Sequence, residues 1–154
     1  MKNLALVLAA LTSFACGGPV GPFSGGALAG EVKPAPESWD FAANVERAQL
    51  ETNAADPHSV NTWIGVADGV AYIPSSMIRG PKDPSEREWV RNVSIDDHVR
   101  VRIGDAIYEL RAARVADGSA EYRAAHEALV KKYALTADDL DPERTIWIYR
   151  LQVR

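Results

Sequence analysis

The chain has 154 residues, of which 47% are hydrophobic and 25% charged, and its formal net charge is −4. This size and balance are typical of one globular domain with a single core. A nucleic-acid-binding protein is expected to carry a basic face, so the mildly acidic charge argues against that class. The single cysteine, Cys16, excludes an intrachain disulfide.

Residues 1–15 have the order of an export signal, with Lys2 near the start, an apolar run at 4–11 and small residues before the end. The apolar run is too short to span a bilayer as a helix. We therefore predict a signal peptide over residues 1–15.

Cys16 and the small residues before it resemble the lipobox of bacterial lipoproteins, in which this cysteine is lipidated and becomes the new N-terminus. Ser13 stands where lipoboxes usually carry Leu, and ordinary secretory cleavage, which leaves Cys16 a free thiol, is the alternative. Gly17, rather than Asp, resembles the sorting pattern for the outer membrane. The resemblance implies an exported lipoprotein, anchored through its lipid alone in the outer membrane and facing the periplasm.

The segment that follows the cysteine is rich in Gly and Pro and carries no charge up to residue 30. Such a composition is typical of a flexible linker, so residues 16–30 are predicted to form the lipid anchor and a tether. Residues 31–154 remain as the folded domain.

Alternating apolar residues and turn dipeptides then predict a mainly β chain. Asp68-Gly69 between two alternating runs is a strong hairpin signal, and Gly104-Asp105 is another. The expected strands lie at residues 45–52, 58–66, 70–74, 99–103, 106–116 and 145–153.

Three helices are expected between these strands. One short helix enters at Ser38, another starts at Pro84 and runs to about Val93, and a long helix is capped by Ser119 and runs to about Ala134. Six mostly antiparallel strands with one long helix and one or two short helices predict a mainly β (α+β) fold, a closed or half-closed barrel.

The candidate site follows the third expected strand. Two hydroxyls end this strand, and several cations follow them within a short loop, which makes a plausible cradle for a phosphate-bearing ligand. The alternative is a solvated surface loop. The residues concerned are Ser75, Ser76, Arg79, Lys82, Arg87 and Arg91. The three histidines, at 58, 98 and 126, lack ligand-like spacing, so no metal site is predicted.

The segment from Leu50 to Lys132 resembles the split β-barrel superfamily of FMN-binding proteins. It is most similar to the pyridoxamine-phosphate-oxidase-like and deazaflavin-dependent nitroreductase branches. Those proteins show a strand ending in Ser or Thr, a basic loop, a Trp and an Asn on a short helix, and an acidic turn into the next strand. The matching residues here are Ser75, Ser76, Arg79, Trp89, Asn92 and Asp97-His98-Val99.

The resemblance implies a six-stranded split antiparallel barrel that binds FMN or a deazaflavin and pairs as a homodimer. It implies that Ser75 and Ser76 hold the cofactor phosphate together with Arg79, Lys82 or Arg87. The ring would lie near Trp63 or Tyr72, and Trp89 and Asn92 would also belong to the cofactor site.

No residue is identified as catalytic, because the hydride chemistry would belong to the cofactor. Two functions therefore stay open. One is a flavin- or deazaflavin-binding oxidoreductase-like lipoprotein, and the other is a cofactor-free envelope lipoprotein that binds a small anion or a partner protein.

Overall fold

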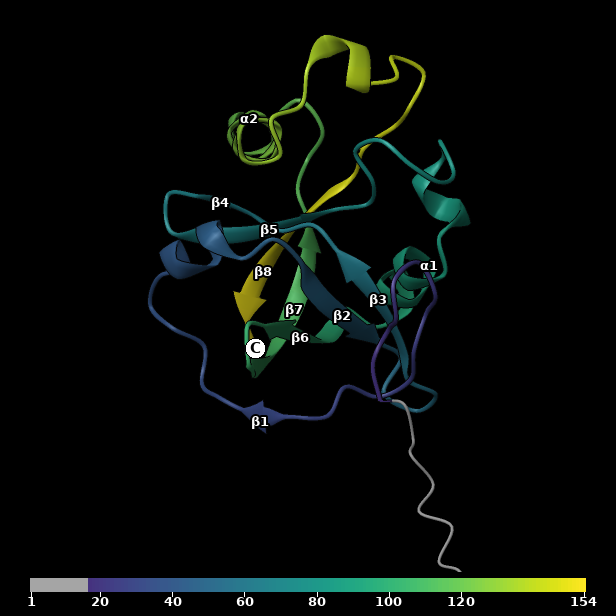
Figure 1. The fold of residues 1–154 in the computed structure, drawn as a ribbon, viewed down its shortest axis with the longest axis vertical. Coiled ribbons are helices and arrows are strands. Elements are labelled where there is room, and N and C mark those ends of the chain that lie inside the picture. Colours follow the sequence, from purple (N-terminus) through teal and green to yellow (C-terminus); the bar gives the residue numbers. More distant parts are fainter. Residues whose placement is uncertain (1–16) are drawn as a thin grey trace, which may run out of the picture.

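The computed structural model describes residues 17–154, and the expected signal peptide and Cys16 lie outside the described residues. Eight strands form one sheet, and two α-helices and three 3-10 helices accompany it (Figure 1). The strands are β1 (Glu31–Val32), β2 (Ala48–Thr52), β3 (His58–Thr62), β4 (Gly65–Ala67), β5 (Val70–Pro74), β6 (His98–Ile103), β7 (Ala106–Arg114) and β8 (Ile148–Val153). The helices are η1 (Asp40–Asn44), η2 (Pro84–Glu86), α1 (Glu88–Ile95), α2 (Ala120–Lys132) and η3 (Ala137–Asp139).

The sheet curls into a half-barrel. Its strand order is β3-β2-β6-β7-β8-β5-β4, with every neighbour antiparallel, and β1 pairs in parallel with β7 beside this path. The two edge strands, β3 and β4, follow each other in the chain. Helix α2 lies beside β4, and α1 lies beside β2 and β3 (Figure 1). The predicted mainly β split barrel is thus confirmed.

The strand expected at 58–66 is broken in two, which corrects the prediction. At the break, the Ile64 amide donates to the Tyr133 hydroxyl at 3.0 Å, and the Ile64 carbonyl accepts from Lys132 Nζ at 2.7 Å. These side chains satisfy the backbone of Ile64 in place of a neighbouring strand. As a result β3 pairs with β2 and β4 pairs with β5.

The predicted alternation over 99–103 is confirmed in β6. Val99, Val101 and Ile103 are buried on the core face, while Arg100 and Arg102 are half-buried on the other. The Asp68-Gly69 hairpin is also confirmed, because both residues have the positive φ, 51° and 74°, that such a turn requires.

The helix ends follow their capping residues. The Ser119 hydroxyl accepts from the Tyr122 amide at 3.0 Å, as expected for the start of α2. The helix expected from Pro84 begins instead with the 3-10 turn η2, whose amide at Ser85 donates to Asp83, and α1 starts only at Glu88. Over residues 17–154, no helix is long and apolar enough to cross a membrane.

Residues 17–30 are not a flexible tether, which corrects a second prediction. Gly25 exchanges two backbone hydrogen bonds of 2.8 Å with Ser59 of β3. The Leu28 side chain is 3% exposed, and its amide donates to the buried carboxylate of Glu51 at 2.5 Å. The same carboxylate accepts from Arg100 at 2.8 Å, so a partly buried ion pair holds this segment on the outer face of β2 and β6.

Candidate functional site

The loop between β5 and α1 and the chain just before β8 bring two guanidinium groups together. Arg87 Nη2 donates to the Arg79 carbonyl at 2.6 Å. Arg144 Nη1 donates to the carbonyls of Gly80 and Pro81 at 3.2 and 2.8 Å, and to that of Arg79 at 3.3 Å. We call Arg79, Arg87 and Arg144 the arginine cluster.

The charge of this cluster has no acidic partner of its own. Within residues 17–154, none of its three members forms an ion pair with a carboxylate. The Nε atoms of Arg87 and Arg144 are buried and lack a hydrogen-bond partner among the described residues. Burial and the nearby Arg144 lower the pKa of Arg87. Adjacent cations with buried, unused N–H donors are suited to an oxyanion such as phosphate.

The two predicted hydroxyls support this loop rather than point freely from it. Ser75 is buried, its amide donates to the Trp147 carbonyl at 2.7 Å, and its hydroxyl accepts from the Trp147 amide at 3.0 Å. The Ser76 hydroxyl accepts from the Arg79 amide at 3.2 Å and donates to the Arg79 carbonyl. Both serines therefore fix the backbone that carries the arginine cluster.

Lys82 lies on the same loop, but its charge is already matched. Its ammonium contacts Glu143 at 2.7 Å and Asp141 at 2.9 Å, and the hydrogen bonds to these acids raise the pKa of Lys82. Lys82, which the resemblance placed among the cations that could hold the cofactor phosphate, is thus paired with two acids. Arg144, which sequence reasoning missed, takes its place beside Arg87. Arg144 is 57 residues further along the chain than Arg87, so no local spacing marks it.

The aromatic residues expected near the cofactor ring pack inside this chain. Trp63 stacks on Tyr133, with ring centroids 4.0 Å apart and an interplanar angle of 9°. Tyr72 is buried and its hydroxyl donates to Glu121 at 3.2 Å, and burial raises the pKa of Tyr72 to about 12. Both side chains belong to the cluster under α2.

Trp89 and Asn92, on α1, also have structural contacts. Trp89 is 4% exposed and packs edge-on against Tyr149, with centroids 5.2 Å apart. Asn92 Nδ2 donates to Thr52 Oγ1 at 3.0 Å, which joins α1 to β2. Of the predicted site residues, the structure thus brings Ser75, Ser76, Arg79 and Arg87 together at the loop.

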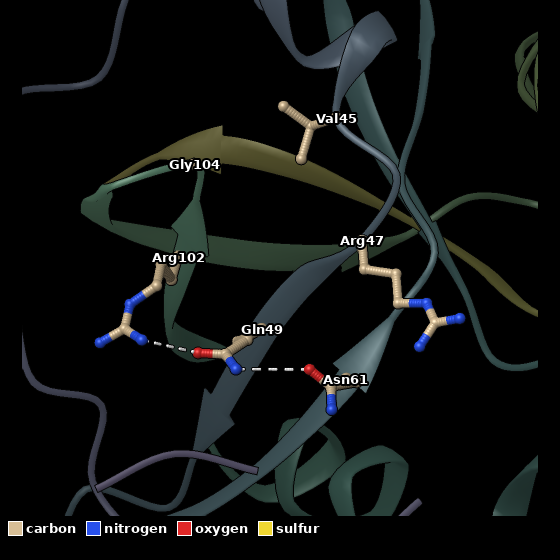
Figure 2. Close-up of a pocket in the computed structure, with 6 residues that line it drawn as sticks. All are labelled: Val45, Arg47, Gln49, Asn61, Arg102 and Gly104. Atoms are coloured by element: carbon tan, nitrogen blue, oxygen red, sulfur yellow. Dashed lines mark hydrogen bonds between the residues drawn. The ribbon is translucent and has the colours of Figure 1, made fainter. Parts of the chain in front are cut away.

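A second polar surface lies on the outer face of β2, β3 and β6. An open pocket of about 300 Å³ is lined there by Val45, Arg47, Gln49, Asn61, Arg102 and Gly104. Figure 2 shows Arg102, Gln49 and Asn61 joined in a row by hydrogen bonds of 2.9 and 3.4 Å. We call this the basic pocket. The sequence indicated only that Arg102 lies on a polar face.

One group of side chains has the spacing of a metal site. The ligand atoms of Asp96, Asp97 and His98 lie within 4.8 Å of one another at the surface. They are engaged locally, since His98 Nδ1 contacts Asp96 at 2.6 Å and Asp97 binds Arg111 at 2.8 Å. This network explains their proximity without an ion.

No protein-family model matches the sequence, and neither does any curated protein. Solved structures do match the fold. They include protein Atu2129 of unknown function from Agrobacterium tumefaciens (TM-score 0.52, 20% identity, 82% of this chain and 58% of that one). They also include an F420-H2-dependent reductase, FDR-A (TM-score 0.54, 16% identity, 80% and 100%). A third is the conserved hypothetical protein Rv2991 from Mycobacterium tuberculosis (TM-score 0.56, 18% identity, 80% and 86%).

These identities are low, so the matches show the fold and nothing finer. The chain spans 58% of the length of Atu2129, but all of FDR-A is covered. The half-barrel with β3 and β4 at its edges is the architecture that the sequence predicted by resemblance. The chain therefore shares its fold with FDR-A and the other solved structures named above.

Proposed function

We propose that the protein binds the phosphate-bearing part of a flavin or deazaflavin cofactor at the arginine cluster, and that it is an oxidoreductase-like protein of the cell envelope. The observation that carries this proposal is the pair Arg87 and Arg144. Both guanidinium groups are held by backbone carbonyls, have no carboxylate partner within residues 17–154, and keep a buried Nε–H unused.

The residues of the cluster fit a phosphate group. A guanidinium presents its donors in a planar fork that matches two phosphate oxygens, and Arg stays charged at neutral pH. Ser75 and Ser76 hold the loop in the shape that gathers the cations, as described above. Arg79 is exposed at the rim and can approach the same anion.

The ring of the cofactor would be held at a different place from the one expected. Tyr72 is buried under α2 and one face of the partly buried Trp63 is covered by Tyr133, so within one chain they offer little aromatic surface to the ring. We propose that a second copy of the chain completes the ring site in a homodimer. When bound, the cofactor supplies hydride transfer at its ring, and the protein binds it, orients it and keeps water away.

The name of one structural match supports the class of ligand. FDR-A is described as a reductase that depends on F420-H2, and it shares the split-barrel fold with this chain. A protein with this fold and an arginine cluster free of acidic partners within residues 17–154 is suited to the same kind of anionic cofactor. The substrate class stays unassigned.

The second candidate is a cofactor-free barrel that binds another small anion or a partner protein at the envelope. The packing of these rings favours it, because Tyr72 and Trp89 are buried and Trp63 is partly buried with one face stacked on Tyr133. The same arginine cluster would then bind the anion. The two candidates differ in whether an isoalloxazine or deazaflavin ring adds affinity beyond that of phosphate alone.

Cell location is part of the proposal. We propose that Cys16 carries lipid and that the protein faces the periplasm from the outer membrane. Mass spectrometry of the mature N-terminal peptide tests this, because a lipidated Cys16 adds the mass of its acyl groups. An unmodified thiol at Cys16 would contradict it.

The cofactor proposal is tested by titrating the purified protein with FMN and with an F420-type deazaflavin while the fluorescence of the cofactor is monitored. A hydrogen bond to a charged group contributes about 1.5–3 kcal/mol, so Arg144→Ala should weaken binding roughly tenfold to a hundredfold. Arg123→Ala is the matched control, because Arg123 is exposed on α2 and contacts only the Gly118 carbonyl.

Equal affinity of the Arg144→Ala and Arg123→Ala variants would reject the arginine cluster as the site. Failure of wild-type protein to bind either cofactor at high micromolar concentration would reject the cofactor. Displacement of a bound fluorescent anion by inorganic phosphate would then support the second candidate, a cofactor-free barrel that binds a small anion.

A further inference from the structure

A tight turn near the start of the described chain presents apolar side chains to solvent. Val20 and Phe23 are 65% and 75% exposed. Their backbones close the turn with hydrogen bonds of 3.2 Å, from the Val20 amide to the Phe23 carbonyl, and 3.0 Å in the reverse direction. Gly21 and Pro22 form its tip. We call residues 20–23 the apolar turn.

The apolar turn is fixed to the body of the domain by polar side chains. Asn61 Nδ2 donates to the Gly21 carbonyl at 3.0 Å, and Gln49 Nε2 donates to the Pro19 carbonyl at 3.5 Å. Pro19 itself is buried. Because its base is anchored in this way, the turn projects Val20 outward in place of letting it fold back onto the core.

The basic pocket adjoins this turn. Gln49 and Asn61, which hold the turn, also line the pocket together with Arg47 and Arg102 (Figure 2). Within residues 17–154, Arg102 has no carboxylate partner, and its guanidinium donates to Gln49 at 2.9 Å and to the Ala29 carbonyl. Arg47 contacts Glu46 at 3.4 Å, in an exposed pair of the kind that contributes little. Two cations therefore lie beside two exposed apolar side chains.

The position of the turn along the chain suggests what covers it. Cys16 is four residues before Val20, and four extended residues reach at most about 14 Å. An acyl chain on Cys16 would hold the apolar turn at the surface of the bilayer. An apolar tip flanked by Arg is the composition of segments that lie in the interface of a membrane with anionic lipids.

We propose that the apolar turn inserts Val20 and Phe23 into the interfacial layer of the membrane, while the basic pocket receives the phosphate of an anionic lipid headgroup. This inference rests on the proposed lipidation of Cys16. It goes beyond a passive lipid anchor, because it makes the domain dock on the bilayer with one defined face. The packed segment 17–30 is what makes this docking rigid.

The single cysteine of the chain makes the test direct. In the lipidated protein the Cys16 sulfur is blocked, so Val20→Cys creates one reactive thiol. Val153→Cys is the matched control, because Val153 is 66% exposed against 65% for Val20, and it lies at the end of β8, outside the turn and the pocket. Each lipidated variant is inserted into preformed vesicles of phosphatidylethanolamine and phosphatidylglycerol and treated with a water-soluble maleimide.

We expect the thiol at position 20 to react at least tenfold more slowly than the thiol at position 153. In vesicles of a zwitterionic lipid alone, or after Arg47→Glu together with Arg102→Glu, that difference should shrink. Equal rates at the two positions in anionic vesicles would overturn the inference. Slow reaction at position 20 in an unlipidated Cys16→Ser, Val20→Cys variant, in buffer without detergent or vesicles, would overturn it as well, since protein rather than lipid would then cover the turn.

The wild-type protein separates this inference from the lipidation on which it rests. Label found on Cys16 of the wild-type chain would show that the cysteine is free, whatever happens at position 20. Peptide mapping of the Val20→Cys variant then still gives the rate of labelling at position 20 separately from that at Cys16. Protection there by anionic vesicles would support docking of the turn, and its absence would refute it.

Discussion

Lys132, near the end of α2, is expected to contribute strongly to stability through bonds to the backbone. Its ammonium donates to the carbonyls of Ala42, Val45 and Ile64 at 2.9, 2.6 and 2.7 Å. These carbonyls precede β2 or lie between β3 and β4. The side chain thus ties α2 to the point where the barrel splits. Burial lowers the pKa of Lys132.

The effect of Lys132→Met can be worked out carbonyl by carbonyl. The Ala42 carbonyl also accepts from the Val45 amide at 3.1 Å. The Tyr133 hydroxyl lies 3.2 Å from the Ile64 carbonyl, but its one proton is shared with the Glu46 carbonyl at 2.7 Å. The Val45 carbonyl has no other donor within the described chain. An unsatisfied buried acceptor costs about 1–3 kcal/mol. The loss of the other two bonds is offset because Met removes the cost of burying the ammonium charge. We therefore expect the free energy of unfolding to fall by about 2 kcal/mol.

Urea unfolding monitored by circular dichroism measures this change in stability, and a thermal midpoint lower by about 4–8 °C should accompany it. Lys131→Met is the control, because Lys131 is the adjacent exposed residue and should change stability by less than about 0.5 kcal/mol. Equal stability of the two variants would refute the reasoning. It would mean that desolvation of the ammonium cancels all three of its bonds.

Three further predictions concern the core, the ion pair and the response to alkali. Ile103→Ala should destabilise by roughly 2–5 kcal/mol, because Ile103 is 2% exposed in the barrel core; a loss below 1 kcal/mol in urea unfolding would speak against its burial. Glu51→Gln should loosen residues 17–30, seen as faster amide exchange at Leu28, because the Arg100 pair loses its charge; unchanged exchange would show that the charge is not needed. Burial raises the pKa of Tyr72 and of Tyr149 to about 12. Since the folded state keeps these phenols protonated above their ordinary value of 10, their contribution is complete below pH 10 and is lost as pH rises toward 12. Burial also raises the pKa of Tyr122 and of Tyr133. Absorbance of tyrosinate should accordingly show at least two late-ionising groups, and ionisation of all tyrosines near pH 10 in the folded protein would contradict this.

The elements that the sequence predicts well are those with local causes. The alternation over 99–103 needs only one buried face, and Ser119 needs only the free amides of the helix it starts. The Asp68-Gly69 turn likewise follows from the φ angles that its two residues tolerate.

The features that sequence reasoning missed depend on polar side chains that reach distant backbone atoms. The break at Ile64 is fixed by Lys132 and Tyr133, about 70 residues later in the chain. The packing of residues 17–30 depends on Glu51 and Arg100 and on the strand pairing of Ser59. A Gly- and Pro-rich composition reads as a linker because it has few side chains to bury, yet its backbone can still be bound.

Only part of the grouping of residues at the candidate site could be inferred from the sequence, for the same reason. Ser75, Ser76, Arg79 and Arg87 are close in sequence, so their grouping could be inferred from spacing. Lys82 has its partners in Asp141 and Glu143, and Arg144 comes from the same distant segment. Which of the cations is neutralised and which stays available is decided by that segment, and no spacing within the loop reveals it.

The account depends most on the claim that the arginine cluster binds a phosphate-bearing cofactor. The most direct measurement is the absorbance and mass spectrum of whatever copurifies with the wild-type protein and with the Arg87→Ala, Arg144→Ala double variant. The account predicts a flavin or deazaflavin on the wild type and its loss from the double variant, with the fold intact by circular dichroism. The same cofactor retained by both proteins would contradict the assignment of the site, and a colourless wild type that does not take up either cofactor would contradict the proposed function.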